Sequence, residues 1–257
     1  MTQDLSILSN LGSKLATLKI REAIRKISIG KRSAYGGGAD VALANTLKAE
    51  AVSNYAASRN LEDALAALQV AQTSLDEIAA LNQRLAELGA LNTNNSLLST
   101  EDTAALNQET ASITTAIDNI VANTKYNNIS LLGTSDVSLN VGASPNGSNQ
   151  LTITIGGISS IASVTSASNA TSTSNTLKSS LGTDQGQVSG ATAAARARKN
   201  VTSTASAILD AAAETKISVD LASETAKLTK NVLLNKVSLS LSAQANNIQS
   251  NKLKLLG

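Results

Sequence analysis

The sequence predicts a mainly α fold, a long antiparallel helical bundle or coiled coil in which the N- and C-terminal helices pair, plus one small β-hairpin. Apolar residues recur at spacings of three and four over most of the chain, which is the period of one helical face. Pro numbers 1 in 257 residues, so long helices stay unbroken. Only segments 137–141 and 151–155 show the alternating pattern of a strand.

The first 35 residues predict an amphipathic helix. Its leucines lie three or four residues apart and therefore share one face. The members of this stripe are Leu5, Leu8, Leu11, Leu15 and Leu18. The segment ends in SAYGGGAD, where Gly36, Gly37 and Gly38 predict a turn, because each Gly costs a helix about 1 kcal/mol relative to Ala.

A second, longer helix is predicted after Asp40, where the same period continues to Leu91 and favours coiled-coil-like packing. The segment NTNNSLLSTED interrupts it, and Ser99 or Thr100 ahead of two acids predicts the capped start of a further helix. That helix is expected to end near Asn123. It should lie antiparallel to the long helix, because the connection between them is short.

Two strands are predicted in the middle of the chain. VSLNV (137–141) and LTITI (151–155) flank a Pro-Asn-Gly segment, which is typical of a β-hairpin. The hairpin's apolar face needs a helical surface to cover, because an isolated hairpin is marginal in water. That face comprises Val137, Leu139, Val141, Leu151, Ile153 and Ile155. The following segment, 156–190, is rich in Ser, Thr and Asn and is expected to be an exposed or weakly ordered loop.

A final helix is expected from about Ala191 almost to the end, because Gly and Pro are absent from Thr192 through Leu256. Its recurrent apolar positions include Leu234, Val237, Leu241 and Ile248. The two terminal segments are predicted to pair, each covering the other's apolar stripe. Neither is expected to hold a stable fold alone, because helices in water are stabilised mainly by packing an apolar face.

Charge also distinguishes the two ends from the middle. Residues 1–35 carry seven Lys or Arg against two acids, and residues 196–257 carry nine against four. Residues 36–195 carry five against thirteen. Basic ends can bind nucleic acid or an anionic membrane, but they also suit two terminal segments that share one environment. The basic cluster near residues 196–199 has no aromatic residue for base stacking, so no nucleic-acid partner is expected.

The composition argues against catalysis. His and Cys both number 0, which removes the imidazole base, the thiolate nucleophile and the preferred ligands of zinc. No catalytic residue, metal site or cofactor is therefore expected, and the protein is not expected to be an enzyme. Three acid pairs are adjacent in sequence, so their members point to different helix faces and are expected to be solvated. They are Glu62–Asp63, Asp76–Glu77 and Glu101–Asp102.

No segment approaches the roughly 18 consecutive apolar residues of a membrane-spanning helix. The N-terminal twenty residues also lack the charged start and apolar block of a secretory signal. Secretion, if it occurs, is expected to use another route.

Three segments resemble one known family, the bacterial flagellins, and they occur in the right order. Residues 74–91, SLDEIAALNQRLAELGAL, are similar to the stretch that combines an acid, an apolar pair, Gln-Arg and Glu-Leu. Residues 116–133, AIDNIVANTKYNNISLLG, follow the family's Ile-Asp, Asn-Thr and Leu-Leu pattern, with Tyr126 where Phe is usual. Residues 223–246 resemble the C-terminal Glu-Thr-Ala, Leu-Thr-Lys and Ala-Gln-Ala-Asn signature.

The chain departs from the family pattern at a few positions. SIGKRSAYGGGADVAL stands where flagellins typically have Ser-Gly-Leu-Arg-Ile-Asn followed by Asp-Asp-Ala-Ala-Gly. Ala86 replaces a second Arg, and Gly89 replaces Ala. The large variable outer domain is missing, its place taken by residues 134–190. The resemblance therefore implies a short, minimal flagellin with only the inner helical domains.

The resemblance also implies a function and a domain organisation. Residues 1–40 and 221–257 would form the terminal coiled coil of the filament core. Residues 41–220 would form a helical bundle that carries the hairpin, at about 137–155. The protein would be a structural subunit that polymerises into the extracellular flagellar filament for swimming motility, its termini folding on assembly. Type III export without a cleaved Sec signal is implied. So are an export chaperone, the filament cap and hook-junction proteins as partners besides the homopolymer.

Two sets of residues are candidates for recognition. Polymerisation and core packing are assigned to the two terminal stripes, which are Leu5, Leu8, Leu11, Leu15, Leu18, Leu234, Val237, Leu241 and Ile248. By resemblance, a surface that contacts the vertebrate Toll-like receptor for flagellin would involve Gln83, Arg84, Glu87, Leu88 and Glu109. The same five residues could instead serve subunit packing, and this interpretation is preferred.

Two rival functions stay open at this stage. A hook-filament junction protein shares the terminal helices but usually has a longer and less helical middle. A peripheral membrane protein would lay its basic amphipathic ends on an anionic bilayer.

Overall fold

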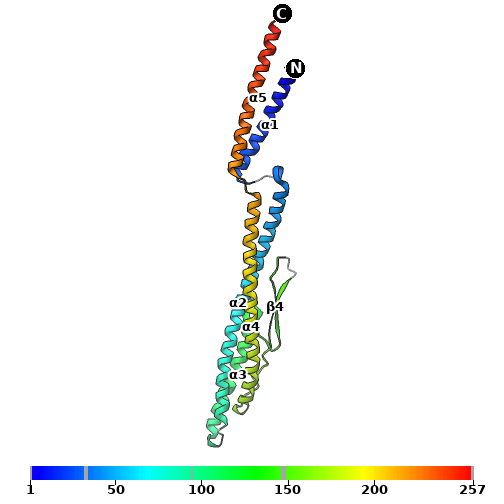
Figure 1. The fold of residues 1–257 in the computed structure, drawn as a ribbon. Coiled ribbons are helices and arrows are strands. Elements are labelled where there is room, and N and C mark those ends of the chain that lie inside the picture. Colours follow the sequence, from blue (N-terminus) through cyan, green and yellow to red (C-terminus); the bar gives the residue numbers. More distant parts are fainter. Residues whose placement is uncertain (1, 32–33, 94, 146–148, 256–257) are drawn as a thin grey trace. The chain divides into compact units, whose positions relative to one another are not determined.

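The computed structural model describes residues 2–31, 34–93, 95–145 and 149–255, and it confirms a mainly α fold with small antiparallel β elements (Figure 1). The chain forms two compact units, which we call unit 1 (Met1–Ala49 with Leu209–Gly257) and unit 2 (Glu50–Ile208). The elements in order are α1 (Thr2–Ile29), α2 (Ala34–Asn92), the 3-10 turn η1 (Asn95–Leu97), α3 (Thr100–Asn123), β1 (Lys125–Tyr126), β2 (Ile129–Ser130), β3 (Val137–Gly142), β4 (Gln150–Ile155), α4 (Ala167–Ile217) and α5 (Leu221–Leu255).

The first helix ends earlier than the glycine run suggests. α1 stops at Ile29, and Gly30 follows with φ +69°, a left-handed conformation that Gly adopts without strain. The backbone N–H of Gly30 donates to Lys26 at 2.8 Å, which closes the helix. The predicted turn at Gly36–Gly38 is wrong, because α2 already begins at Ala34. Gly disrupts a helix least in its first turn, where N–H groups lack intrahelical partners in any case.

The connection from α2 to α3 is as predicted. Ser99 is the N-cap of α3, and its hydroxyl accepts from the backbone N–H of Asp102 at 3.0 Å. The Asp102 carboxylate accepts in return from the backbone N–H of Ser99 at 3.1 Å, so the two residues form a capping box. α3 ends at Asn123, as the sequence predicts.

The predicted β-hairpin is confirmed. β3 and β4 pair antiparallel, with Val137 opposite Ile155, Leu139 opposite Ile153 and Val141 opposite Leu151. The six apolar side chains therefore share one face, as predicted. Ile153 and Ile155 are fully buried in the core of unit 2, so the helices supply the cover that this face needs. A shorter pair, β1 and β2, turns through Asn127 and Asn128, both with positive φ.

The segment 156–190 is not the loop that its composition suggests. α4 begins at Ala167, and Ala170, Leu177, Leu181 and Val188 are buried in the core of unit 2. Their spacing is helical, but small residues occupy many of the intervening and buried positions, so the apolar signal is weak. Packing against α2 and α3 therefore overrides a poor local propensity.

The remaining connection, residues 156–166, is held by polar side chains of α3. Asp118 accepts from the backbone N–H groups of Ile161 and Ala162, both at 3.0 Å, and from the Ser160 hydroxyl. Thr114 donates to the carbonyl of Val164 at 3.0 Å. Asn107 accepts from the backbone N–H of Ala167 at 2.8 Å, which satisfies an orphan donor at the start of α4.

The C-terminal helix is interrupted where a continuous helix is predicted. α4 ends at Ile217 and α5 begins at Leu221. Asp220 caps the new helix, because its Oδ1 accepts from the backbone N–H groups of Ala222 at 3.0 Å and Ser223 at 3.1 Å. The break needs neither Gly nor Pro, so their absence from the sequence was a poor guide to helix continuity.

The core of unit 2 is aliphatic and joins all of its helices and the hairpin. Its largest fully buried side chains are Leu61, Leu68, Leu75, Ile78, Leu85, Leu88, Ile117, Leu131, Leu132, Ile153, Ile155 and Ile158. At one end of this core, α2 approaches α4 closely at Gly89. A Cβ built on Gly89 would lie 2.6 Å from the backbone nitrogen of Thr171, so a larger residue does not fit.

We predict that Gly89→Ala destabilises the protein by about 1 kcal/mol or more, because the collision with Thr171 outweighs the better helix propensity of Ala. The matched control is Gly182→Ala in α4, where a Cβ meets nothing within 4 Å and a gain of roughly 0.5 to 1 kcal/mol is expected. Urea unfolding followed by circular dichroism measures both changes. Equal gains for the two variants would contradict the close approach at Gly89.

One buried carboxylate works against the stability of unit 2. Asp184 of α4 is only 2% exposed, and its Oδ2 makes no hydrogen bond among the described residues. Burial raises the pKa of Asp184, the backbone N–H of Gly156 partly opposes this rise, and the nearby charge of Asp136 adds to it. The ionised form is therefore disfavoured in the folded chain.

We predict that Asp184→Asn raises the free energy of unfolding at pH 7, by an amount on the order of 1 kcal/mol. The pKa of Asp184 is higher in the folded chain than the value of about 3.9 for an unfolded chain. Its negative charge therefore destabilises the fold at pH values above the folded-state pKa, and protonation removes this cost as the pH falls through that pKa. The advantage of Asn should therefore shrink toward about pH 4. Urea unfolding over a pH series tests this, with exposed Asp63→Asn as control. An advantage that is independent of pH would refute the assignment.

Candidate assembly surfaces

Helices α1 and α5 pack along each other in unit 1 through a seam of small and polar residues (Figure 1). On α1 the buried positions recur every seven residues, at Ser9, Ala16 and Ala23. On α5 the fully buried apolar residue is Ala245. The Ser13 hydroxyl donates to Oδ1 of Asn235 at 2.7 Å, which links the two helices directly. A seam of this kind brings the helix backbones close but buries little apolar surface.

The predicted stripes lie outside this seam. Leu8 and Leu18 are 67% and 62% exposed, and Leu241 is 42% exposed. The other stripe residues with described side chains are exposed as well, namely Leu11, Leu15, Leu234, Val237 and Ile248, and the side chain of Leu5 lies outside the described residues. The terminal helices do pair, but the expectation that each covers the other's stripe is wrong. Small residues fit the close seam better than Leu, so the leucines face outward.

Unit 1 consequently has no aliphatic core of its own among the described residues. Among the side chains that the structure describes in unit 1, the buried apolar ones are all alanines, namely Ala16, Ala23, Ala44, Ala213 and Ala245. Exposed contiguous apolar surface on a helix pair is typical of a protein interface. The residues predicted to act in polymerisation are therefore exposed on this helix pair, apart from Leu5, whose side chain lies outside the described residues.

An ion-pair cluster joins three segments of unit 1. Glu214 of α4 accepts from Nζ of Lys48 in α2 and from Nζ of Lys31, 3.4 Å away, just after α1. Lys31 also forms an isolated antiparallel bridge with Ser218. The hydrogen bond from Lys48 lowers the pKa of Glu214, and it raises the pKa of Lys48 in turn. No pattern in the sequence marks these residues, because they lie far apart along the chain.

Four of the five receptor-surface candidates are on the surface. Arg84 on α2 donates to Glu109 on α3 at 2.8 Å and to Glu87 at 3.0 Å. These two carboxylates raise the pKa of Arg84 above its usual value, so it stays charged. Gln83 is exposed as well. Leu88 is 0% exposed, so it packs inside unit 2 and cannot be a surface contact in this fold.

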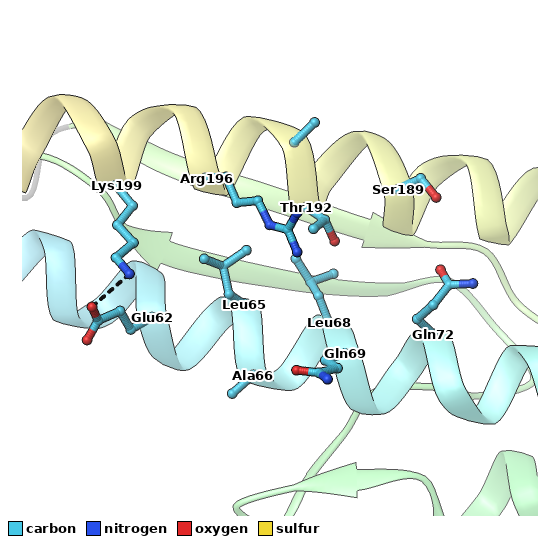
Figure 2. Close-up of a pocket in the computed structure, with 11 residues that line it drawn as sticks. Glu62, Leu65, Ala66, Leu68, Gln69, Gln72, Ser189, Thr192, Arg196 and Lys199 are labelled. Atoms are coloured by element: carbon cyan, nitrogen blue, oxygen red, sulfur yellow. Dashed lines mark ion pairs between the residues drawn. The ribbon is translucent and has the colours of Figure 1, made fainter.

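A groove of about 650 Å³ runs along unit 2 between α2 and α4 (Figure 2). Lys199 on α4 forms an ion pair with Glu62 on α2 at 2.9 Å. Figure 2 shows Arg196 extending from α4 toward α2, above a floor that includes Leu68. Two members of the basic cluster near residues 196–199 therefore lie along this groove. Their neighbours are polar and aliphatic, and the groove offers no aromatic stacking platform.

Within the described ranges, no cluster of three or more acidic, His or Cys side chains could hold a metal ion. Nor does any helix in the described part of the chain carry an apolar stretch of the length needed to cross a bilayer.

Comparisons with known proteins identify the family of this chain. Residues 4–137 match the bacterial flagellin N-terminal helical region. The chain is 30% identical over 256 residues to a flagellin of Halalkalibacterium halodurans, with 92% of this chain and 91% of that protein covered. It is also 30% identical over 120 residues to a flagellin of Clostridium tyrobutyricum, covering 46% of this chain and 32% of that protein. Among solved structures, Bacillus cereus flagellin aligns at 21% identity with a TM-score of 0.38, covering 56% of this chain and 85% of that one.

The family match covers more than half of the chain, and the Halalkalibacterium halodurans flagellin aligns along nearly all of it. Each of these findings assigns the chain to a family. They favour the filament subunit over the junction-protein and membrane-binding alternatives. The chain belongs to the bacterial flagellin family, whose members are structural subunits of the extracellular flagellar filament rather than enzymes.

Proposed function

We propose that the terminal helices form the filament core and that they become fully stable only when subunits assemble. The observation that carries this proposal is the outward position of the leucines on α1 and α5, together with the fact that the buried apolar residues described in unit 1 are all alanines. Assembly would bury these stripes against neighbouring copies. Residues 1–40 and 221–257 are the proposed core domain, and residues 41–220 the surrounding helical bundle.

The energy scale supports coupling between folding and assembly. Apolar burial contributes roughly 25 cal/mol per Å², whereas ordering one residue costs about 1 to 2 kcal/mol in backbone entropy. A helix pair whose buried apolar residues are alanines gains little to offset that cost. Contacts with several neighbours add the missing area. Head-to-tail contacts that do not close then produce an open filament.

Export and partners follow from the same proposal. A chain with a marginal unit 1 suits passage through a type III channel in an unfolded state, without a cleaved Sec signal. An export chaperone would cover the exposed stripes before secretion, and the filament cap and hook-junction proteins would meet the same helices outside the cell.

The central test is Leu241→Asp, with Ser240→Asp as the matched control on the neighbouring exposed position of α5. We expect Leu241→Asp to abolish polymerisation, because a charge would be buried in the subunit seam. Its monomer should keep the parent helicity, because Leu241 is exposed there. Electron microscopy after seeding and circular dichroism measure the two properties. Normal filaments from Leu241→Asp would overturn the assignment of the stripe.

The export route has its own test. We expect the intact mass of filament protein to correspond to the chain from residue 1, or from residue 2 after removal of Met1. Mass spectrometry of sheared filaments makes this measurement. A mass that lacks a longer N-terminal segment would show that a leader had been cleaved.

A further inference from the structure

The two units of the chain carry opposite charge. Unit 1 has fourteen Lys or Arg against seven acids, and unit 2 has seven against twelve. Like-charged units repel when copies come together, so the basic unit 1 of one copy gains if an acidic surface of another copy lies against it.

Unit 1 presents positive charge in a groove of about 400 Å³ between α1 and α5. Lys19 and Lys26 of α1 line it, facing Lys227 and Lys230 of α5. Glu22 pairs with Lys26 at 2.7 Å, and the largely buried Glu224 pairs with Lys227 at 2.9 Å. The hydrogen bond from Lys26 and the nearby cations together lower the pKa of Glu22, in accord with a basic groove.

Two lysines remain after this pairing. Neither Lys19 nor Lys230 forms an ion pair with a carboxylate in the described part of the chain. Leu234, a member of the exposed apolar stripe of α5, also lines the groove. The groove is therefore continuous with the proposed polymerisation surface, and a copy that covers the stripe would also reach the two lysines.

Unit 2 presents the complementary charge on α2. Of the three adjacent acid pairs, two have a member already engaged, because Glu62 binds Lys199 and Asp102 caps α3. Asp76 and Glu77 are both exposed, and neither is in an ion pair with a described cation. Asp76 accepts only from the neutral amides of Gln72 and Gln185. This pair thus keeps its full negative charge for a partner.

We propose that the basic groove of α1 and α5 receives the Asp76–Glu77 face of a second copy. This inference rests on the proposed assembly of unit 1. Lys19 and Lys230 meet the two carboxylates across the contact, while the apolar stripe beside them supplies most of the affinity. Exposed ion pairs add little energy singly, but opposite charges steer encounter and fix which surfaces meet. The contact is heterologous, so its repetition extends a filament.

Charge reversal tests the contact. Lys19→Glu with Lys230→Glu is expected to slow elongation from wild-type seeds by about tenfold at low salt. Lys14→Glu with Lys216→Glu, which changes unit 1 by the same charge outside the groove, should slow it much less. Adding Asp76→Lys and Glu77→Lys to the groove variant should restore most of the rate when the seeds carry the same four substitutions. Light scattering measures the rate of elongation. If the two charge reversals perturb folding, the neutral double variant Lys19→Gln with Lys230→Gln tests the same contact more mildly.

Cross-linking tests the same contact directly, because the chain has no Cys of its own. Filaments grown from a mixture of Lys230→Cys copies and Glu77→Cys copies should yield covalent dimers with a short bismaleimide. Filaments grown from a mixture of Lys216→Cys and Glu77→Cys copies should yield no covalent dimers. Filaments that contain only the Lys230→Cys variant or only the Glu77→Cys variant should also yield none.

The outcomes separate the two proposals. If the wild-type chain fails to polymerise, the proposed function itself fails. If it polymerises and both double reversals elongate equally, or if no dimer forms across positions 230 and 77, this contact is refuted while the filament role stands. Binding of the wild type to vesicles of anionic lipid, lost in the groove variant whose elongation is unchanged, would assign the groove to a membrane and would also overturn the proposal.

Discussion

The interior of unit 1 is the constraint on which the rest of the structure depends. Two long helices meet through serine, glycine and alanine positions, and the leucines that a helix pair would normally bury face outward. Leu8 on α1 and Leu241 on α5 are examples, because both side chains are exposed although the two helices pack against each other. We propose that a unit built in this way gains its apolar burial from other molecules. Its stability is therefore expected to depend on subunit concentration.

Unit 2 differs from unit 1 because it forms an aliphatic core within a single chain. Its buried leucines and isoleucines come from three helices, the hairpin and the loops between them, so one aliphatic cluster joins segments far apart in sequence. Polar side chains of α3 then fix the connection into α4, with Asp118 holding two backbone N–H groups. This unit can present fixed surfaces, such as the groove beside Arg196 and the Asp76–Glu77 face, from a scaffold with its own core.

The sequence predicts those elements whose signal is local and strong. The cap at Ser99, the end of α3 near Asn123 and the shared apolar face of the hairpin all follow from adjacent residues, and all three are confirmed. The start of α4 could not be found in this way, because its buried face includes alanine and serine and the helix is ordered by contacts with α2 and α3. The break at Asp220 was missed because a capping aspartate can end one helix and begin another without Gly or Pro.

The leucine stripes of α1 and α5 show what the spacing of apolar residues cannot predict. A stripe of leucines shows that one face of a helix is apolar and is stabilised by burial. It does not show whether that face packs against the same chain or against another molecule. The small residues of the seam supply that information, because a helix pair that packs through Ser9, Ala16 and Ala23 leaves its leucines for another molecule. Two heptad-spaced faces on one helix, one small and one large, therefore indicate two different partners. In unit 1 the first is the other terminal helix, and the second is best explained by the neighbouring subunits of the filament.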